Sequence, residues 1–485
     1  MVVSEKSILT YLRELAAARP DKRLLGEDTR WLDTQTALSL VERSGAAFRA
    51  LGLTGGAFVA LRAHRTAAAA IVMWGLRAAG AVAVLAEPRQ EIARTLFDAE
   101  TPLPIAAVIE QTGQTTFRVY PLNVPDAPEQ TVDLLSLPPA DGFQMNENAL
   151  EPAYVIFTSG STGKSKAVVL SESNLVNNLI DSQPLGDYTD DDLALGSVPL
   201  HHVFGLVLLA GVAVLGYGMF FPEKTDVPSL LAAIEKHRLT RMNGVPSLYL
   251  AMADQSERYD VSSMRSGYIG GGPVTEQQFA QIEEKLGMTL IPVYGMSECI
   301  GISCASYKDT QAVRAGGVGP FYSMNTGKIL RDDGTEAALG ESGEICVTGP
   351  ARMIGYWGHP MGREELLHTG DVGYVDEHGV LHLTGRKKDI IIRNGYNLSP
   401  RKIEKALLAI PGVKEAVVVD LPDDRQGEVP AAMVAAYPSV TELHPDLPKN
   451  ELPVVIHLVD ALPLTASGKP DRQRIREELA ACRLG

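Results

Sequence analysis

The segment between residues 158 and 166 limits the possible folds of the chain most, because it is a polar, glycine-containing loop between two short apolar runs. The loop reads Thr158-Ser-Gly-Ser-Thr-Gly-Lys-Ser-Lys166, and the apolar runs cover residues 154–157 and 167–170. Short apolar runs bounded by turn residues are typical of buried β-strands. Glycines let backbone N–H groups approach an anion, while hydroxyls and lysines add hydrogen bonds and positive charge. The pattern predicts a strand–loop–strand unit that is either a phosphate-binding loop or a plain polar hairpin.

A Walker A loop is the nearest general pattern, and the sequence does not match it. That pattern, G-x-x-x-x-G-K-[ST], begins with a glycine and is followed by a helix. Thr158 stands at the position of the first glycine, and the apolar run after the loop predicts a strand. A phosphate site here would therefore belong to a different class of nucleotide-binding protein.

Strands and helices alternate in the first third of the chain. Apolar runs predict strands at residues 58–62 and 81–86, and helical spacing of apolar residues predicts helices at 7–19, 36–51 and 66–79. This alternation is typical of an α/β fold with a parallel sheet. Residues 120–148 contain five prolines and little periodicity, so we predict a loop or an edge region there.

A charged break, Arg386-Lys-Lys-Asp389, predicts a domain boundary and hinge. Residues 1–385 would form a large domain of mixed sheets flanked by helices, and residues 390–485 a small, mobile α+β domain. Within the large domain we predict a helix at 227–237, strands at 268–273 and 289–294, and short β elements at 343–349 and 379–385. Within the small domain we predict a helix near 400–409 and strands at 416–419 and 431–436.

Charge and cysteine content exclude some functions. The net charge of −15 disfavours binding to nucleic acid, because such a surface repels a phosphate backbone. The four cysteines, Cys299, Cys304, Cys346 and Cys482, form no CxxC pair, so they predict neither a zinc site nor a disulfide framework. The N-terminus lacks the apolar core of a signal peptide, and we expect a reducing, cytoplasmic location.

The stretch from Val203 to Phe221 has no charged residue over 19 positions, which is long enough to raise the possibility of a membrane span. Four glycines interrupt it and Pro222 follows it. We therefore predict a buried helix that leads into a core strand, and no stable insertion into a membrane.

Further motifs follow the loop in a fixed order. They are Tyr294-Gly-Met-Ser-Glu298, His368-Thr-Gly-Asp371, Gly385-Arg386 and Pro463-Leu-Thr-Ala-Ser-Gly-Lys469. With this set the chain resembles the adenylate-forming superfamily, and within it the AMP-dependent acyl- and aryl-CoA synthetases. The resemblance covers nearly the whole chain and is strongest from about residue 150 to 475. It implies that a carboxylic acid reacts with ATP to give an acyl-adenylate and pyrophosphate, and that the acyl group then passes to a thiol.

The resemblance also implies a nucleotide site. Its ATP-binding residues would be Thr158, Ser159, Gly160, Ser161, Thr162, Gly163, Lys164, Lys166, Gly270, Gly271, Gly272, Pro273, Tyr294, Gly295, Asp371 and Arg386. Glu298 would hold Mg²⁺, since a hard carboxylate oxygen suits this ion, and Ser297 would face the α-phosphate. Without these neighbours, Glu298 would be taken for a solvated carboxylate and Asp371 for part of an Asx-turn.

The small domain would supply the remaining groups. Lys469 resembles the catalytic lysine of the family, although a Ser-Gly-Lys sequence alone more often marks a surface turn. Lys388 matches the hinge position about which the small domain swings. After the swing, Gly395 would line a tunnel for the thiol, which we expect to belong to CoA or to the phosphopantetheine of a carrier protein.

Residues of the acid pocket follow from the same resemblance. His202 would lie near the substrate carboxylate, or serve only in core packing, and the walls would include Phe204, Val245, Tyr249 and Tyr268. These walls are mostly apolar, as ligand pockets tend to be. The aspartate that holds an amino group in amino-acid-activating relatives is missing, so we expect an aromatic or medium-chain carboxylic acid.

Several positions depart from the family pattern. Ser165 replaces the usual proline, Ala167 the following glycine, and Ser171-Glu172 the usual threonine-histidine. These changes keep the anion-binding atoms but leave substrate and acceptor open. Three alternatives remain: an enzyme that loads a carrier protein, an adenylate-binding protein without activity, and a luciferase-like oxygenase.

Overall fold

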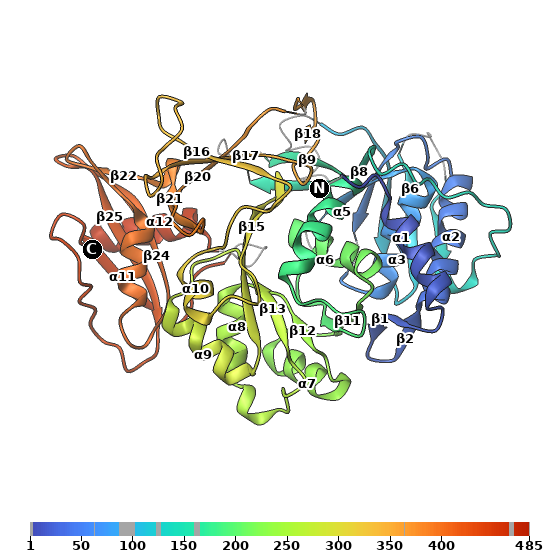
Figure 1. Cartoon of the computed structure of the whole chain (residues 1–485), viewed down its shortest axis with the longest axis horizontal. Coiled ribbons are helices and arrows are strands. Elements are labelled where there is room, and N and C mark those ends of the chain that lie inside the picture. Colours follow the sequence, from blue (N-terminus) through green and yellow to red (C-terminus); the bar gives the residue numbers. More distant parts are fainter. Residues whose placement is uncertain are drawn as a thin grey trace.

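The computed structural model describes residues 3–62, 64–86, 102–122, 128–159, 165–362, 364–464 and 470–484. Figure 1 shows the N-terminal helices at one end of the molecule and the C-terminal α+β unit at the other, with the remaining sheets between them. The predicted α/β class is confirmed, with mixed sheets in the long N-terminal part and a small C-terminal unit.

The first large sheet has the strand order β19-β18-β9-β8-β4-β3-β5-β6-β7. Its strands are β3 (Phe58–Arg62), β4 (Val82–Ala86), β5 (Ile105–Gln111), β6 (Thr116–Pro121), β7 (Gln130–Asp133), β8 (Pro152–Ser159), β9 (Ser165–Ser171), β18 (Gly355–Tyr356) and β19 (His359–Pro360). Strands β3, β4, β5 and β8 run parallel, as the alternation with α2 (Thr34–Ala50) and α3 (Ala67–Ala79) predicts. The proline-rich stretch contributes β7, which forms the edge of this sheet.

The second large sheet has the order β15-β14-β13-β12-β10-β11-β1-β2. Its strands are β1 (Arg23–Glu27), β2 (Arg30–Asp33), β10 (Leu193–Leu195), β11 (Gly218–Phe221), β12 (Arg241–Met242), β13 (Ser266–Ile269), β14 (Thr289–Met296) and β15 (Cys299–Cys304). The helices of this part are α1 (Ile8–Ala18), α5 (Glu172–Ser182), α6 (Val203–Val214), α7 (Val227–His237), α8 (Pro246–Ala253), α9 (Glu276–Leu286) and α10 (Gln311–Gly316).

A smaller antiparallel sheet and the C-terminal unit complete the fold. The smaller sheet contains β16 (Thr326–Leu330), β17 (Gly343–Thr348), β20 (Leu367–Val375) and β21 (Leu381–Arg386). The C-terminal unit contains β22 (Ile391–Arg393), β23 (Tyr396–Leu398), α11 (Pro400–Leu408), β24 (Val413–Asp423), β25 (Gly427–Ala436), β26 (Val455–Val459) and α12 (Arg472–Leu484). It contacts the large part through a 2.6 Å hydrogen bond from Ser399 Oγ to Thr384 O. The boundary at 386–389 stays a prediction.

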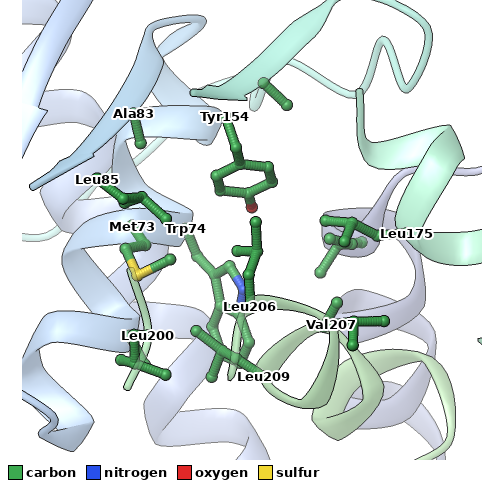
Figure 2. Close-up of a cluster of buried hydrophobic side chains, with 14 of the residues drawn as sticks. Met73, Trp74, Ala83, Leu85, Tyr154, Leu175, Leu200, Leu206, Val207 and Leu209 are labelled. Atoms are coloured by element: carbon green, nitrogen blue, oxygen red, sulfur yellow. The ribbon is translucent and has the colours of Figure 1, made fainter. Parts of the chain in front are cut away.

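Helix α6 lies in the main hydrophobic core. Figure 2 shows Leu206 and Leu209 of α6 beside Trp74 of α3 and Tyr154 of β8, and all four side chains are almost completely buried. The apolar stretch 203–221 is therefore the predicted buried helix followed by strand β11. Among the described residues, none of the helices combines the length and the hydrophobicity that a membrane crossing requires.

A buried ion pair accounts for one departure from the family pattern. Glu172, at the start of α5, lies 3.7 Å from Arg77 Nε of α3 (Oε1 to Nε), and both side chains are at most 1% exposed. Its other oxygen accepts a hydrogen bond from the Ile8 amide at the start of α1. Burial raises the pKa of Glu172, and Arg77 opposes that rise. The glutamate thus connects three helices.

We expect Arg77→Met to destabilise the protein by about 3–5 kcal/mol, because it leaves the Glu172 carboxylate buried without its cation. The free energy of unfolding from urea denaturation measures the effect. Because paired apolar replacement of a buried ion pair is often tolerated, the double variant Arg77→Met/Glu172→Met should recover part of the loss. A double variant less stable than the single one would contradict this account.

Candidate functional site

The predicted nucleotide-site residues come from strand ends and turns of all three sheets of the large part. Lys166 lies on β9, Tyr294 on β14, Glu298 in the β14–β15 turn, and Asp371 on β20. From Lys166 to Asp371 these residues span about 200 positions of the chain, yet hydrogen bonds and a cation–π contact arrange them in two small groups. One group is centred on Asp371 and the other on Glu298.

The Asp371 group combines a buried carboxylate with two donors. Asp371 is 8% exposed. Its Oδ2 accepts a 2.8 Å hydrogen bond from the Tyr294 hydroxyl, and its Oδ1 accepts a 2.7 Å hydrogen bond from Arg386 Nε. Thr369 fixes the backbone below it, since its Oγ1 accepts from the Asp371 amide and donates to Ile345 O. Each carboxylate oxygen can accept more than one hydrogen bond, so Asp371 keeps capacity for ligand hydroxyls.

Tyr294 and Gly295 owe their positions to an irregular strand pair. The pairing of β14 with β15 shifts register between Tyr294 and Met296. A Cβ on Gly295 would stand 2.1 Å from Ile300 O, so only glycine lets the two strands approach this closely. Burial raises the pKa of the Tyr294 hydroxyl, and the Asp371 charge adds to the rise. The hydroxyl therefore stays a hydrogen-bond donor at neutral pH.

The Glu298 group has a tyrosine at its centre. The Tyr356 hydroxyl of β18 donates a 2.8 Å hydrogen bond to Glu298 Oε1. Lys166 Nζ lies over the same ring, 4.9 Å from its centroid. Glu298 is 8% exposed. Tyr356 thus donates a hydrogen bond to a carboxylate through its hydroxyl and makes a cation–π contact with an ammonium through the face of its ring. Tyr356 was not among the predicted site residues, because nothing in its neighbours Gly355 and Trp357 signals these contacts.

The two strands predicted on either side of the 158–166 loop are present as β8 and β9. β8 and β9 are antiparallel, with Thr158 opposite Lys166 and Ser159 opposite Ser165. Gly160, Ser161, Thr162, Gly163 and Lys164 lie outside the described residues. The strand pairing brings the hairpin end that carries Lys166 to the Glu298 group. Ser297, next to Glu298, is half-buried.

The glycine turn after β13 packs closely at one point. A Cβ on Gly270 would stand 2.8 Å from Val293 O, and Gly271 adopts a φ of +81°. Both positions therefore favour glycine. Gly271, Gly272 and Pro273 are exposed, and a Cβ on Gly271 would meet Val245 at 3.3 Å. Val245 accordingly lies beside the glycine turn that is predicted to bind ATP.

The predicted acid-pocket residues belong to two core clusters that are joined by hydrogen bonds. Phe204 packs against a small cluster that contains Tyr268, Ile291 and Tyr322. Tyr249 belongs to another cluster, where it is fully buried and its hydroxyl lies 2.7 Å from Met242 O and 3.1 Å from Tyr268 O. The role of these residues as walls of an acid pocket stays a prediction.

His202 caps the start of α6, and its ring lies 4.4 Å from the ring of His201. His201 lines a small apolar cavity with Leu61 and Met73. Burial lowers the pKa of His201 to about 4, with a further contribution from His202. His201 is therefore neutral at physiological pH and, of the two histidines, is the one that lines the apolar cavity.

The residues predicted on the small domain lie apart from these groups or outside the described chain. Lys388 is exposed in the short 3₁₀ turn Lys387–Asp389. Gly395 has a φ of +80°, and among the described residues nothing lies within 4 Å of the point where its Cβ would stand. In this arrangement no described wall surrounds Gly395, so the thiol tunnel stays a prediction for another arrangement. Lys469 lies outside the described residues.

Arg401 of α11 is a further cation near Asp371 that the sequence analysis did not identify. Burial lowers the pKa of its guanidinium, and the charges of Glu404 and Asp371 oppose the shift. α11 also packs against β21, which carries Arg386. The charges of two guanidinium groups, Arg386 in the predicted boundary segment and Arg401 beyond it, therefore act on the same carboxylate.

Comparison with known proteins gives matches along most of the chain. The family model for AMP-binding enzymes matches residues 12–357, and the model for the C-terminal domain of AMP-binding enzymes matches residues 402–469. A long-chain-fatty-acid–CoA ligase of Escherichia coli O157:H7 is 30% identical over 347 residues, which are 67% of this chain and 61% of the relative. The chain thus spans less than two thirds of the length of that relative.

Two further similarities extend over more of both chains. A 2-succinylbenzoate–CoA ligase of Bacillus cereus (strain Q1) is 32% identical over 422 residues, which cover 84% of this chain and 85% of the relative. The structure of o-succinylbenzoate CoA synthetase from Bacillus subtilis, in complex with its acyl-adenylate intermediate, has a TM-score of 0.81 and 25% identity. That similarity covers 96% of this chain and 97% of the solved one.

Proposed function

Because the chain belongs to the family of AMP-binding enzymes, we propose that it joins a carboxylic acid to ATP and then transfers the acyl group to a thiol, that of CoA. In the first half-reaction the carboxylate attacks the α-phosphorus of ATP, which gives an acyl-adenylate and pyrophosphate. In the second, the thiol attacks the acyl carbonyl and AMP leaves. The observation that carries the proposal is the buried Asp371 carboxylate, which accepts hydrogen bonds from Tyr294 and Arg386.

Each group has a role that suits its chemistry. The Asp371 carboxylate accepts hydrogen bonds from the ribose hydroxyls, and Arg386 offsets its charge. Lys166, with the loop residues 158–164, binds the β- and γ-phosphates. A carboxylate attacking a triphosphate brings like charges together, so catalysis depends on neutralising charge and on positioning the two reactants. Lys469 supplies the cation for the developing charge at the α-phosphate.

Glu298 fits a magnesium ion. Its carboxylate is a hard oxygen ligand, and the hydrogen bond from Tyr356 occupies only one acceptor position on Oε1. When bound, Mg²⁺ would neutralise phosphate charge. In the protein, Tyr356 orients the carboxylate, and the Ser297 hydroxyl beside it is available to the α-phosphate.

For the acid, the half-buried ring of Phe204 and the cluster around Tyr268 support an aromatic or medium-chain substrate. The relatives named above act on long-chain fatty acids and on 2-succinylbenzoate, and both are carboxylic acids with large apolar parts. We propose a cytoplasmic location, since both ATP and CoA are available there. A carrier-protein phosphopantetheine is the second candidate acceptor, because its thiol is chemically the same as that of CoA.

Acid-dependent exchange of pyrophosphate into ATP tests the proposal. A panel of aromatic, medium-chain and long-chain acids would be assayed with and without CoA. We expect exchange with a subset of the acids, and AMP formation that depends on CoA. Exchange without CoA consumption would point to a carrier protein, and lack of exchange with every acid would overturn the proposed activity.

Tyr356→Phe is expected to weaken the apparent affinity for Mg²⁺ by about tenfold or more, because partners that orient a metal ligand typically contribute 10- to 100-fold. The variant removes the hydroxyl that orients Glu298 and keeps the ring under Lys166. The half-saturating Mg²⁺ concentration in the exchange assay measures the effect.

Tyr356→Ala is the matched variant, since it removes both contacts. It should add a rise in the KM for ATP to the magnesium defect. Equal Mg²⁺ dependence in wild type and Tyr356→Phe would show that the hydroxyl does not orient the metal ligand.

A further inference from the structure

A thiol, an imidazole and a carboxylate gather on one face of the small antiparallel sheet. Glu344 and Cys346 lie two residues apart on β17, and His368 of β20 is the strand partner of Cys346. The Cys346 Sγ lies 3.3 Å from His368 Nδ1, and the same Nδ1 lies 3.3 Å from Glu344 Oε2. One potential ligand atom from each residue lies within 4.8 Å of the other two.

These separations fit the ligand shell of a tetrahedral ion. For zinc with ligand bonds of about 2.0–2.3 Å, neighbouring ligand atoms stand roughly 3.3–3.6 Å apart. The distances from His368 Nδ1 to the sulfur and to the carboxylate oxygen, both 3.3 Å, lie at the near end of that range. The sulfur and the oxygen lie within 4.8 Å of each other, so a rotation of the side chains would let all three contact one ion, with a bound water as the fourth ligand.

The burial of the three residues also suits such a site. Cys346 is fully buried, while the His368 side chain is 60% exposed and leaves a route to solvent. A metal ion binds Cys346 as the thiolate, so binding would release the thiol proton to solvent.

We propose that Glu344, Cys346 and His368 bind one divalent transition-metal ion of the zinc type, at a site separate from the magnesium ligand Glu298. Sulfur and imidazole ligands favour zinc and related ions, whereas magnesium takes oxygen ligands. The two metal sites would thus be selective for different ions.

The neighbours of Glu344 connect this site to the hinge. Lys387 Nζ, in the segment 386–389, lies 3.4 Å from Glu344 Oε2 and 3.1 Å from Asp332 Oδ1. Oε2 is also the oxygen that faces His368. The ion and Lys387 therefore compete for one oxygen of Glu344. When the metal binds, Lys387 would keep only its ion pair with Asp332. The Gly370 amide holds the other oxygen, Oε1, at 3.2 Å and keeps the carboxylate in place.

Cobalt(II) is a suitable probe, because its absorption reports a sulfur ligand directly. The full chain, freed of metals and kept reduced, would be titrated with Co²⁺ in excess Mg²⁺. We expect one equivalent to bind, with a thiolate-to-cobalt charge-transfer band in the near ultraviolet. Cys346→Ser should abolish the band, while Cys482→Ser, which changes an exposed cysteine, should retain it. Circular dichroism would verify that both variants are folded.

Two further variants test the other contacts. His368→Ala should weaken Co²⁺ binding by at least about tenfold, since it removes a direct ligand. Lys387→Ala should tighten binding by about two- to fivefold, because it removes an exposed competing ion pair. The absence of a charge-transfer band, a band that survives Cys346→Ser, or weaker binding in Lys387→Ala would overturn the proposal. None of these readouts depends on the proposed enzyme activity.

Discussion

Lys469→Ala is expected to slow acyl-adenylate formation by about 10²–10³-fold, the usual effect of removing one charged contact to a transition state. The lysine ammonium would neutralise charge that develops as the carboxylate attacks the α-phosphate, and that charge is absent from the second half-reaction. Thioester formation from a supplied acyl-adenylate should therefore change little. Rapid-quench measurement of each half-reaction separates the two effects.

Lys449→Ala is the matched control, because Lys449 is an exposed lysine of the same C-terminal unit. Leu464 and Pro470, the described residues on either side of the segment that contains Lys469, form an antiparallel bridge. If Lys469→Ala slowed both half-reactions equally, the lysine would act in both arrangements of the small domain, and the predicted swing about Lys388 would lose its support.

Local patterns were sufficient to predict many elements of the fold. The predicted bounds of β3 and α7 agree with the structure, and α3 begins one residue later than predicted. α6 begins at Val203, the first residue of the predicted apolar stretch. These segments have a single dominant periodicity and clear ends, such as the αL glycine, Gly80, after α3. Their structure is determined mainly by residues that are neighbours in sequence.

Short strands were harder to predict, because their pairing partners are distant. β10 and β12 contain only a few residues each and are defined by parallel pairing with one another. The His368-Thr-Gly-Asp371 motif lies within β20, although it was placed only between two β elements. A glycine inside that motif weakens the strand signal, and the pairing with β17 and β21 compensates for it.

The candidate site shows the same limit. Family motifs identified Asp371, Glu298 and Lys166, but not the contacts that orient them. Tyr356 contacts Glu298 across 58 positions of sequence, and the charge of Arg401, in the C-terminal unit, interacts with that of Asp371. Such partners cannot be predicted from local sequence, because a tyrosine or arginine that contacts the site has the same kind of sequence neighbours as one on the surface.

The cysteine pattern illustrates how a spacing rule can overlook a cluster. The absence of CxxC pairs predicted that no zinc site would occur, because that rule considers ligands from one turn. In the folded chain, strand pairing sets Cys346 opposite His368, and Glu344 lies on the same face. The ligand set proposed above combines three residue types from two strands, which only the sheet register brings together.

Asp371→Asn is expected to raise the Kd for ATP by about 10- to 100-fold. A hydrogen bond to a charged group contributes about 1.5–3 kcal/mol, and the amide keeps the shape of the side chain but loses its charge. The loss should be large because Asp371 is only 8% exposed, so water compensates poorly. Calorimetric titration with ATP and Mg²⁺ measures it.

Asp376→Asn is the control, since Asp376 belongs to the same β20–β21 hairpin but pairs with His382 at 2.8 Å. It should leave the Kd for ATP unchanged. An equal Kd in wild type and Asp371→Asn would exclude Asp371 from the nucleotide site.

The size of the Asp371 effect relative to that of Arg386 distinguishes two roles for the ion pair. If Arg386 serves mainly to orient and neutralise Asp371, Arg386→Gln should raise the Kd for ATP less than Asp371→Asn does. In that variant Tyr294 still donates to the carboxylate, and the arginine side chain is 49% exposed. If Arg386 instead binds phosphate directly, Arg386→Gln should raise the Kd for ATP as much as Asp371→Asn does, or more. The affinity for AMP should then fall less than the affinity for ATP. We expect the first order, since the Arg386 Nε donates to Oδ1 at 2.7 Å.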